Sequence, residues 1–280
     1  MTRITPRRRS VLFLPASNAR AIEKARTLPC DAIILDLEDA VAPDAKAAAR
    51  DAAVAAAAIG FGDRELIIRI NALDSEWAAA DIAAVRSSKA DGVLLPKISR
   101  ATDLATARGA LDGKPIWAMV ETCTSILNLA EIADAAADNR LVALVAGTND
   151  LAKEMRCRPD TARSQLVPAL VQIVIAARAA GIAAIDGVLN AIEDGDRLAA
   201  ECSQGSMLGF DGKTLIHPSQ IDTANAAFSP DEASIAWAKS VVAAFADAGN
   251  DNKGAIRLNG AMIERLHLVE ARQILALAKG

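Results

Sequence analysis

Acidic and basic side chains follow several short apolar runs of this chain, each at the point where the run ends. One polar residue at the end of a strand is usually a solvated loop residue. Several acidic groups brought to one place repel one another unless a cation or a paired positive charge holds them. The pattern therefore favours a reaction site built from strand ends. The charged residues concerned are, in chain order, Asp36, Glu38, Asp39, Arg69, Lys97, Glu121, Asp150, Asp186 and Lys213, and Pro15 stands at the end of the first run.

Glu121 and Asp150 follow two consecutive apolar runs and offer oxygen ligands. Mg²⁺ is commonly bound by one or two carboxylates together with water and substrate oxygens, so the pair predicts a Mg²⁺ site, with Mn²⁺ as an alternative. Zinc is disfavoured because no His or Cys joins the pair. His217, which precedes Pro218, is interpreted as a structural contact that orients its loop.

Arg69 stands at the end of the third apolar run, close in sequence order to the acidic group around Asp36. A guanidinium at a strand end can hold a carboxylate or a thioester oxygen with two parallel donors. A structural ion pair with Glu38 or Asp39 is the alternative. Both interpretations can hold together, because such a pair would also orient the arginine.

Short β-branched runs alternate with helical patterns along the chain. Alternation of this kind predicts βαβ units and a parallel sheet buried on both faces. The expected strands are 11–14, 32–35, 66–70, 92–95, 116–120, 141–145, 183–185 and 206–210. The expected helices are 18–27, 44–59, 75–87, 101–111, 125–136, a long region ending near 180, 191–203 and 218–227.

Eight such units predict an α/β fold in which residues 1–228 form a (β/α)8 TIM barrel, the catalytic domain. An open doubly wound sheet is the alternative, although no Gly-x-Gly-x-x-Gly follows the first strand. Residues 229–280 are expected to be a C-terminal helical extension, or lid, packed on the barrel or on a neighbouring subunit. Its parts are a helix at 231–248, a polar link at 250–254, and an extended piece with a final helix at 255–279.

The composition narrows the function classes. The chain has 280 residues, 52% hydrophobic and 3% aromatic, with a formal net charge of -4, which disfavours nucleic acid or an anionic membrane as the main partner. The one basic run, 7–9, is interpreted as a solvated tail, with contact to an anion as the alternative because the run adjoins the first strand. No apolar stretch reaches about 18 residues, so no membrane span is expected. Four cysteines without paired spacing, and no signal peptide, favour a cytoplasmic protein.

Seven short motifs, in order, resemble those of citrate lyase β-subunit-like proteins, within the HpcH/HpaI aldolase superfamily. They are Ser10-Val-Leu-Phe-Leu-Pro-Ala-Ser, Asp36-Leu-Glu-Asp-Ala-Val, Ile68-Arg-Ile-Asn, Leu94-Leu-Pro-Lys, Val120-Glu-Thr, Gly147-Thr-Asn-Asp-Leu-Ala and Ile216-His-Pro-Ser-Gln-Ile. Each motif alone is weak, but seven in sequence are strong. The superfamily includes malyl-CoA and citramalyl-CoA lyases.

The resemblance implies a Mg²⁺-binding (β/α)8 barrel that assembles as a homo-oligomer, a trimer or hexamer. The implied metal ligands are Glu121 and Asp150, and Arg69 is the implied substrate-binding arginine. Pro15, Lys97 and Glu121 would contact substrate as well. Asp36, Glu38 and Asp39 would hold metal-bound waters or Arg69 in place.

The implied reaction is a reversible Claisen-type cleavage of a 3-hydroxyacyl-CoA thioester such as malyl-, citramalyl- or citryl-CoA. Its products would be acetyl-CoA, or a homologue, and a 2-oxo acid such as glyoxylate, pyruvate or oxaloacetate. Arg69 would stabilise the negative charge that develops on the thioester enolate. The identity of the acyl group, and the choice between CoA and an acyl-carrier protein, stay open.

Two positions depart from the resembled pattern. Asn149 stands where the family often has an acidic residue, and Glu264 stands where many of its lyases have a lid Asp that acts as acid/base from the neighbouring subunit. The added methylene of Glu264 can displace the carboxylate by about 1 Å, which can cost about a hundredfold in rate. Three alternatives therefore stay open: an aldolase acting on a free 2-oxo acid, a malyl-CoA-type thioesterase, and a non-catalytic subunit that binds a CoA ester.

Overall fold

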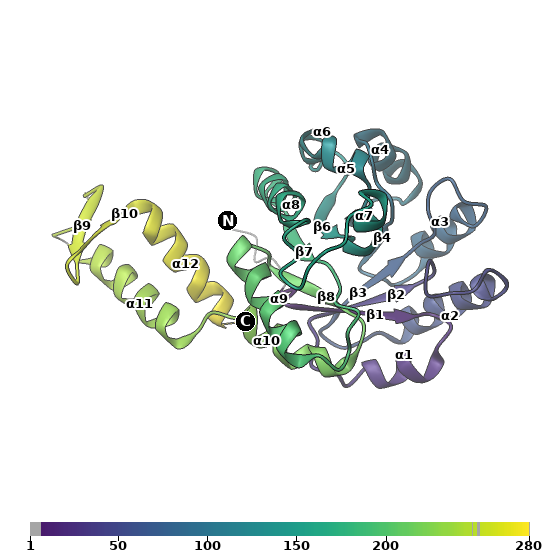
Figure 1. Cartoon of the computed structure of the whole chain (residues 1–280), viewed down its shortest axis with the longest axis horizontal. Helices are drawn as coiled ribbons and strands as arrows, with labels where there is room; N and C mark the ends of the chain where they lie inside the picture. Colours follow the sequence, from purple (N-terminus) through teal and green to yellow (C-terminus); the bar gives the residue numbers. More distant parts are fainter. Residues whose placement is uncertain (1–6, 248, 251–252, 280) are drawn as a thin grey trace. The chain divides into compact units, whose positions relative to one another are not determined.

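The structure is a computed structural model that describes residues 7–247, 249–250 and 253–279. Eight parallel strands close into a barrel in chain order, with β1 paired to β8 (Figure 1). This confirms the predicted (β/α)8 fold. The strands are β1 (Ser10–Pro15), β2 (Ala32–Asp36), β3 (Glu65–Arg69), β4 (Gly92–Leu95), β5 (Ile116–Val120), β6 (Leu141–Ala146), β7 (Ala183–Asp186) and β8 (Gly212–Leu215).

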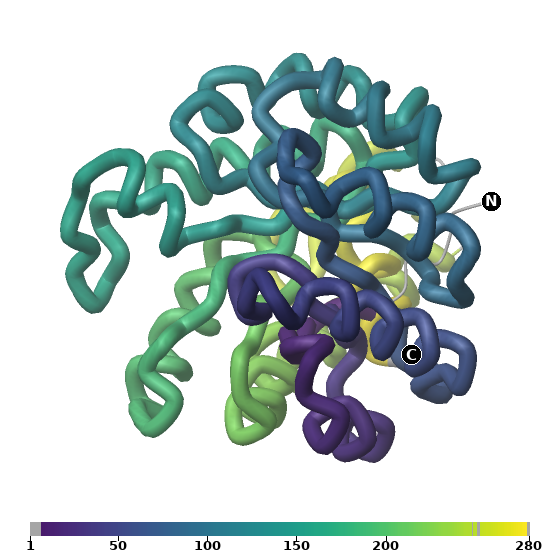
Figure 2. The backbone as a smooth tube through the Cα atoms, turned by 90° about the vertical axis from the view of Figure 1, so that its right-hand side faces the viewer, coloured from purple at the N-terminus to yellow at the C-terminus, as the bar shows by residue number. Residues whose placement is uncertain are grey.

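Helices follow the strands and surround the barrel, and the tube in Figure 2 passes round it from purple through teal to green. Two helical regions are divided more finely than the sequence predicts: 125–136 becomes α5 and α6, and the region ending near 180 becomes α7 and α8. The elements are α1 (Ala19–Ala25), η1 (Pro43–Ala45), α2 (Lys46–Ile59), α3 (Ala78–Ser87), α4 (Ala101–Ala110), α5 (Cys123–Leu127), α6 (Leu129–Asp134), α7 (Thr148–Glu154), α8 (Val167–Ala180), α9 (Gly195–Leu208), η2 (Pro218–Gln220) and α10 (Ile221–Ala227).

Alternate residues of the strands fill the barrel interior. Ile34, Ile67, Trp117 and Val145 belong to one buried cluster, and their strand neighbours are buried as well. Parallel strands covered on both faces read as continuous apolar runs, which is why seven of them could be located from sequence. The barrel is therefore a packed core, and side chains at its carboxyl end are held on short, rigid strands.

The predicted eighth strand at 206–210 is wrong. Those residues lie at the end of α9, where Gly209 adopts a φ of +96° and stops the helix, and β8 follows. The true strand was missed because it carries Lys213, a charged residue that is fully buried. Lys213 therefore lies near the start of β8, and the carboxyl end of that strand leads into His217 instead.

The amino-terminal mouth of the barrel contains Arg8. Its guanidinium donates two hydrogen bonds to Glu65, at 2.7 and 2.8 Å, and a third to the Val142 carbonyl at 3.2 Å. It also lies over the Trp117 ring, 4.5 Å from the ring centroid. The interpretation of the basic run as a solvated tail is therefore wrong for Arg8, which is 5% exposed.

The chain divides into two compact units, and the barrel unit spans Arg8–Ala226. The second unit includes Arg7 and the chain from Ala227 onward. It contains α11 (Glu232–Ala246), the antiparallel strands β9 (Ala255–Leu258) and β10 (Ala261–Glu264), and α12 (Arg265–Lys279). The sequence interpretation gave one extended piece where the structure has a hairpin. Asn259 and Gly260 turn that hairpin with φ values of +50° and +85°, as a two-residue Asn-Gly loop does.

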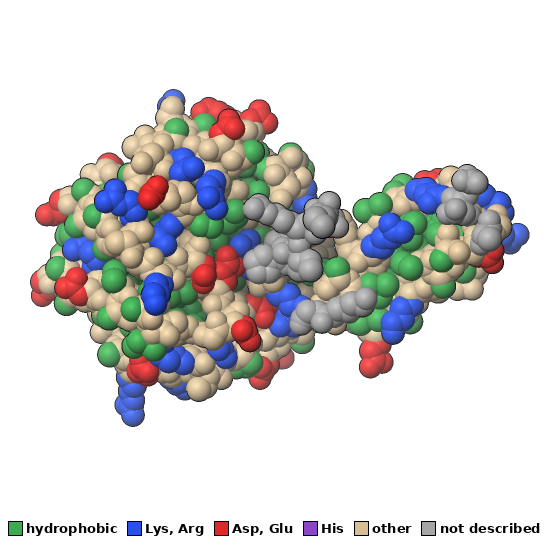
Figure 3. Space-filling view, turned by 180° about the vertical axis from the view of Figure 1, so that it is seen from behind, with side chains coloured by type: hydrophobic (Ala, Val, Ile, Leu, Met, Phe, Trp, Pro, Cys, Tyr) green, Lys and Arg blue, Asp and Glu red, His purple; other side chains and the backbone are tan. Residues whose placement is uncertain are grey.

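Charged side chains of both signs are interspersed over the face of the molecule seen in Figure 3. A mixed distribution of this kind is typical of a solvated surface. Among the described helices, none is both long and apolar enough to cross a membrane.

Candidate active site

Arg69 and Asp36 form the centre of the carboxyl-end mouth. They end β3 and β2, and the strand register pairs them directly. The Arg69 Nε and Nη2 atoms each lie 2.7 Å from an Asp36 carboxylate oxygen, so the pair is bidentate and charge-assisted. Both side chains are buried, at 7% and 1% exposure, and the ion pairs around Arg69 raise the pKa of its guanidinium against the effect of burial. Arg69 is therefore fixed and permanently charged.

Glu38 and Asp39 also face Arg69, with oxygens 2.9 and 3.6 Å from its Nη1 atom. Glu38 accepts a hydrogen bond from the Lys97 ammonium. Burial raises the pKa of the Glu38 carboxyl, and Arg69 and Lys97 act against that rise. Because the Lys97 side chain is 43% exposed, it is the cationic group of this cluster that incoming solute meets first.

A buried chain of polar groups supports the loop after β2. The Lys46 ammonium donates to the carbonyls of Leu37 and Glu38, both at 2.9 Å, and to Asn71 Oδ1 at 2.6 Å. Asn71 in turn donates to Asp81 at 2.7 Å. Asn71 belongs to the Ile68-Arg-Ile-Asn motif, whereas Lys46 and Asp81 carry no sequence signal because their partners are set by tertiary packing. These hydrogen bonds hold the backbone of Glu38 in place, so that its side chain faces Arg69.

Glu121 ends β5 and is 1% exposed. Its Oε1 atom accepts a hydrogen bond of 2.7 Å from the Lys97 backbone N–H, which the positive φ of Lys97, +54°, directs toward it. Burial and the nearby Glu38 carboxylate raise the pKa of Glu121 to about 7. Its Oε2 atom accepts no hydrogen bond from any described residue, so one oxygen of a buried carboxylate is left for a ligand.

Asp150 lies in the first turn of α7, and Gly147 connects that helix to β6. A Cβ added at Gly147 would lie 2.3 Å from the Glu121 Cβ, so only glycine lets the turn pass this close to Glu121. Asp150 is half-buried and pairs with no described side chain.

The two carboxylates fit a hard divalent cation. Each keeps unshared oxygens, and no described His or Cys side chain joins them. Among the residues that the structure describes, no group of three or more His, Cys, Asp and Glu side chains is placed to hold a metal by itself. A cation at Glu121 and Asp150 would therefore complete its shell with water or substrate, as Mg²⁺ usually does.

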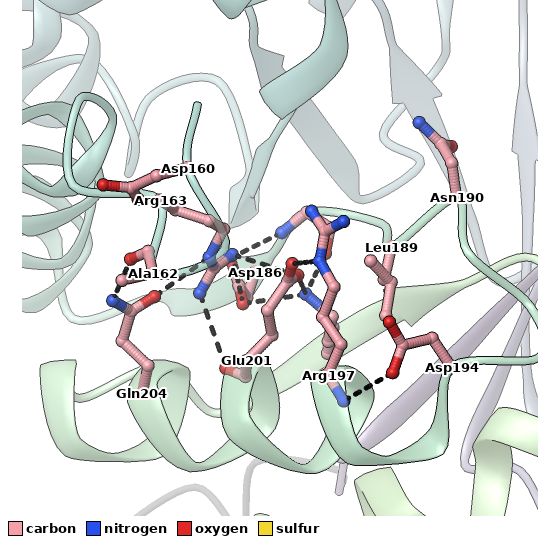
Figure 4. Close-up of polar contacts among 12 residues, drawn as sticks. Asp160, Ala162, Arg163, Asp186, Leu189, Asn190, Asp194, Arg197, Glu201 and Gln204 are labelled. Carbon is pink, nitrogen blue, oxygen red and sulfur yellow. Dashed lines mark hydrogen bonds and ion pairs between the residues drawn. The ribbon is translucent and has the colours of Figure 1, made fainter. Parts of the chain in front are cut away.

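Two of the charged residues noted in sequence lie in a different, fully paired network (Figure 4). Asp186 binds Arg163 at 2.8 Å and the Lys213 ammonium at 3.1 Å, and Lys213 also pairs with Glu201 at 3.2 Å. Burial raises the pKa of Asp186, but the two cations outweigh it and the net direction is downward. This network joins β7, β8 and α9, and its role is structural. Sequence reasoning missed Arg163 and Glu201, which carry no motif.

The remaining candidates lie as follows. Pro15 ends β1 in register with Asp36, at the edge of the Arg69 cluster. The Nδ1 atom of His217 accepts a hydrogen bond from the Ser219 N–H at 3.2 Å, consistent with a structural contact. Glu264 ends β10 in the second unit, where its N–H donates to His267 Nδ1 at 2.9 Å.

Comparisons with known proteins agree with this fold. The family model described as HpcH/HpaI aldolase/citrate lyase matches residues 9–218. The chain is 48% identical to a (3S)-malyl-CoA thioesterase of Cereibacter sphaeroides, over 97% of this chain and 94% of that protein. It is 35% identical to the citrate lyase subunit beta of Escherichia coli K12, over 99% and 95%.

Among solved structures, the chain resembles protein CitE from Mycobacterium tuberculosis in complex with magnesium, acetoacetate and coenzyme A. The TM-score is 0.79 at 30% identity, covering 97% of this chain and 98% of that one. The chain therefore belongs to the HpcH/HpaI aldolase/citrate lyase family.

Proposed function

We propose that this chain is a Mg²⁺-dependent enzyme that acts on a malyl-type 3-hydroxyacyl-CoA and hydrolyses its thioester. The proposed Mg²⁺ site is supported by the surplus of carboxylates at the carboxyl-end mouth of the barrel, where Glu121 and Asp150 keep unshared oxygens. The choice of thioester hydrolysis rests on the 48% identity to a (3S)-malyl-CoA thioesterase across nearly the whole chain.

Glu121 and Asp150 would hold the metal in this proposal. Mg²⁺, when bound, supplies a Lewis acid and a template for substrate oxygens, and Mn²⁺ offers the same chemistry. A magnesium ion and coenzyme A are present together in the structure of the related protein CitE. That relative supports both the metal and the CoA ester as ligands of this family member.

Arg69 would bind the oxygen on which negative charge develops. Asp36 occupies its Nε and Nη2 atoms, while Nη1 faces Glu38 and Asp39 and lies 3.6 Å from the Met119 sulfur. A buried, preorganised guanidinium stabilises charge far more than one that must reorient. Lys97 would attract the anionic end of the substrate, because its exposed ammonium is the outermost cation of the cluster.

Carbon–carbon cleavage is the second candidate, favoured by the family match and by the citrate lyase relatives. The two reactions differ in the bond that breaks. In hydrolysis, water oxygen bonds to the thioester carbon, the C–S bond breaks, and the thiolate takes a proton. In cleavage, the 3-hydroxyl loses its proton, the C2–C3 bond breaks, and the acetyl carbon takes a proton.

Product analysis separates the two reactions. The chain is incubated with Mg²⁺ and malyl-, methylmalyl-, citramalyl- or citryl-CoA, and free thiol and 2-oxo acid are measured together. We expect malyl-CoA to give CoA thiol and malate in equal amounts without glyoxylate. Formation of glyoxylate and acetyl-CoA would establish a lyase. If none of the esters gave a product, the chain would be a non-catalytic subunit that binds a CoA ester. Asp150→Ala, which lacks a proposed metal ligand, is the matched control.

Glu264 is proposed as an acid/base that reaches the mouth of a neighbouring subunit. The support is its position at the end of the β9–β10 hairpin, directly before α12, in a unit distinct from the barrel. Glu264→Gln is expected to lower turnover at least tenfold, and Glu264→Asp to retain it. Wild-type turnover in both variants would refute this role. Assembly as a homotrimer or hexamer remains a prediction that mass measurement in solution can check.

A further inference from the structure

The loop between β7 and α9 (187–194) is anchored at its start. The Gly187 N–H donates to Asp186 Oδ1 at 2.8 Å, and the Gly187 carbonyl accepts from the Lys213 ammonium at 2.5 Å. Further along, the Leu189 carbonyl accepts a hydrogen bond of 3.1 Å from Gln220, which is 1% exposed. The buried network of Figure 4 therefore fixes the base of this loop.

The same loop contacts the first turn of α7 in two places. A Cβ added at Gly187 would lie 2.5 Å from the Thr148 hydroxyl oxygen, so the loop begins directly against the helix. One residue further along α7, the Asn149 side chain forms a reciprocal amide pair with Asn190. The Asn190 Nδ2 donates to Asn149 Oδ1 at 2.9 Å, and the Asn149 Nδ2 donates to Asn190 Oδ1 at 3.3 Å. In Figure 4, Asn190 points away from the buried network.

The chemistry of this pair suits its place. Two amides satisfy each other with one donor and one acceptor apiece and add no charge. A carboxylate at position 149 would lack a donor for the Asn190 oxygen and would place a second negative charge beside Asp150. Both asparagines are exposed, so they are not required for the packed core.

We propose that the Asn149–Asn190 pair is a latch that positions Asp150 for cation binding. The anchored loop holds the first turn of α7 through this pair, and Asp150 is the next residue of that turn. Asn149 and Asn190 are thus positioning residues that act through Asp150 and do not touch the metal. The inference rests on the proposed function, because it takes Asp150 as a ligand of Mg²⁺.

Calorimetric titration of Mg²⁺ tests the latch without reference to turnover. Asn149→Ala and Asn190→Ala should each weaken Mg²⁺ binding by about threefold, the usual effect of losing a modest hydrogen bond. The double variant should bind as weakly as either single variant and no more weakly, because one interaction is removed in all three. Glu193→Ala, an exposed change on the same loop, is the matched control and should bind as wild type.

Amide hydrogen exchange, measured without metal, supplies a second readout. Loss of the latch should speed exchange in 187–194 in both single variants and leave the strands of the barrel unchanged. Wild-type affinity in the single variants, multiplied losses in the double variant, or unchanged exchange in the loop would each overturn the inference. A wild-type chain that binds no Mg²⁺ would instead reject the proposed function, and the latch role with it.

Discussion

The two mouths of the barrel each contain a buried arginine in a forked pair with one carboxylate. At the amino-terminal mouth, Arg8 binds Glu65 and lies over Trp117. At the carboxyl-terminal mouth, Arg69 binds Asp36 and lies over the Phe13 ring, 5.0 Å from its centroid. The geometry of the two pairs is nearly the same.

The charge around the two arginines differs. Arg8 faces one carboxylate and directs its spare donor to a backbone carbonyl, so that mouth is balanced. At the other mouth, only Arg69 and Lys97 form ion pairs with the acidic side chains among the residues that the structure describes. The five acidic residues there are Asp36, Glu38, Asp39, Glu121 and Asp150. Asp36, Glu38 and Glu121 are buried, and a local surplus of negative charge opposes folding, so it is expected where a cation binds.

Breaking the balanced pair should have the largest effect, and that effect should fall on stability. Arg8→Met leaves Glu65 unpaired at 14% side-chain exposure, which should cost about 3 kcal/mol of the free energy of unfolding. Denaturant unfolding measures this loss. Turnover of the protein that remains folded should be unchanged.

A double variant that removes both charges of the Arg8–Glu65 pair sharpens this test. In Arg8→Met with Glu65→Leu, neither charge is left buried alone, so most of the lost stability should return. Equal stability of Arg8→Met and the wild type would show that the Arg8–Glu65 pair contributes little to stability. The amino-terminal mouth would then have no demonstrated structural role.

Changing the upper arginine should affect catalysis instead. Arg69→Lys keeps the positive charge but cannot reproduce the two-donor fork, so kcat/KM should fall about a hundredfold while the midpoint of unfolding changes little. Steady-state kinetics on malyl-CoA with Mg²⁺ provides the measurement. Full activity in Arg69→Lys would refute the proposed role of the fork.

The smallest expected effect is a shift in pH dependence at the upper mouth. Burial and Glu38 raise the pKa of Glu121 from 4.5 to about 7, so the proton competes with Mg²⁺ and affinity should rise as pH increases through about 7. In the metal-free chain this raised pKa stabilises the fold at low pH, and the contribution is lost as pH rises through about 7.

Glu38→Gln removes a like charge and frees Arg69 and Lys97 to favour the Glu121 carboxylate. The midpoint of the Mg²⁺ affinity profile should therefore move to lower pH, by about one unit. Calorimetry at several pH values checks the direction. A midpoint that stays in place would mean that Glu38 does not control Glu121.

The sequence predicted the strand ends well wherever strands are uniformly apolar. Asp36, Arg69 and Glu121 all lie at the predicted edge, because the position of a residue at the end of a buried strand follows from its neighbours. β8 was missed because buried Lys213 breaks the apolar pattern and is satisfied only by partners on β7 and α9. Local pattern cannot identify such partners.

Other features also divide into those with a local sequence signal and those set by tertiary packing. The Asn259-Gly260 turn is a local signal that sequence reasoning could have used to predict the hairpin. The Lys46–Asn71 hydrogen bond and the Asn149–Asn190 pair join residues on different elements of the fold. They depend on side-chain geometry in the folded chain, which residue type and spacing do not specify.

The most direct test of the central claim is the Mg²⁺ affinity of the wild type, Asp150→Ala and Arg8→Met, measured by calorimetry at pH 8. If the surplus of carboxylates at the carboxyl-end mouth is a cation site, Asp150→Ala should bind Mg²⁺ at least tenfold more weakly than the wild type. Arg8→Met, altered at the opposite mouth, should bind it as the wild type does. Unchanged affinity in Asp150→Ala would contradict the account.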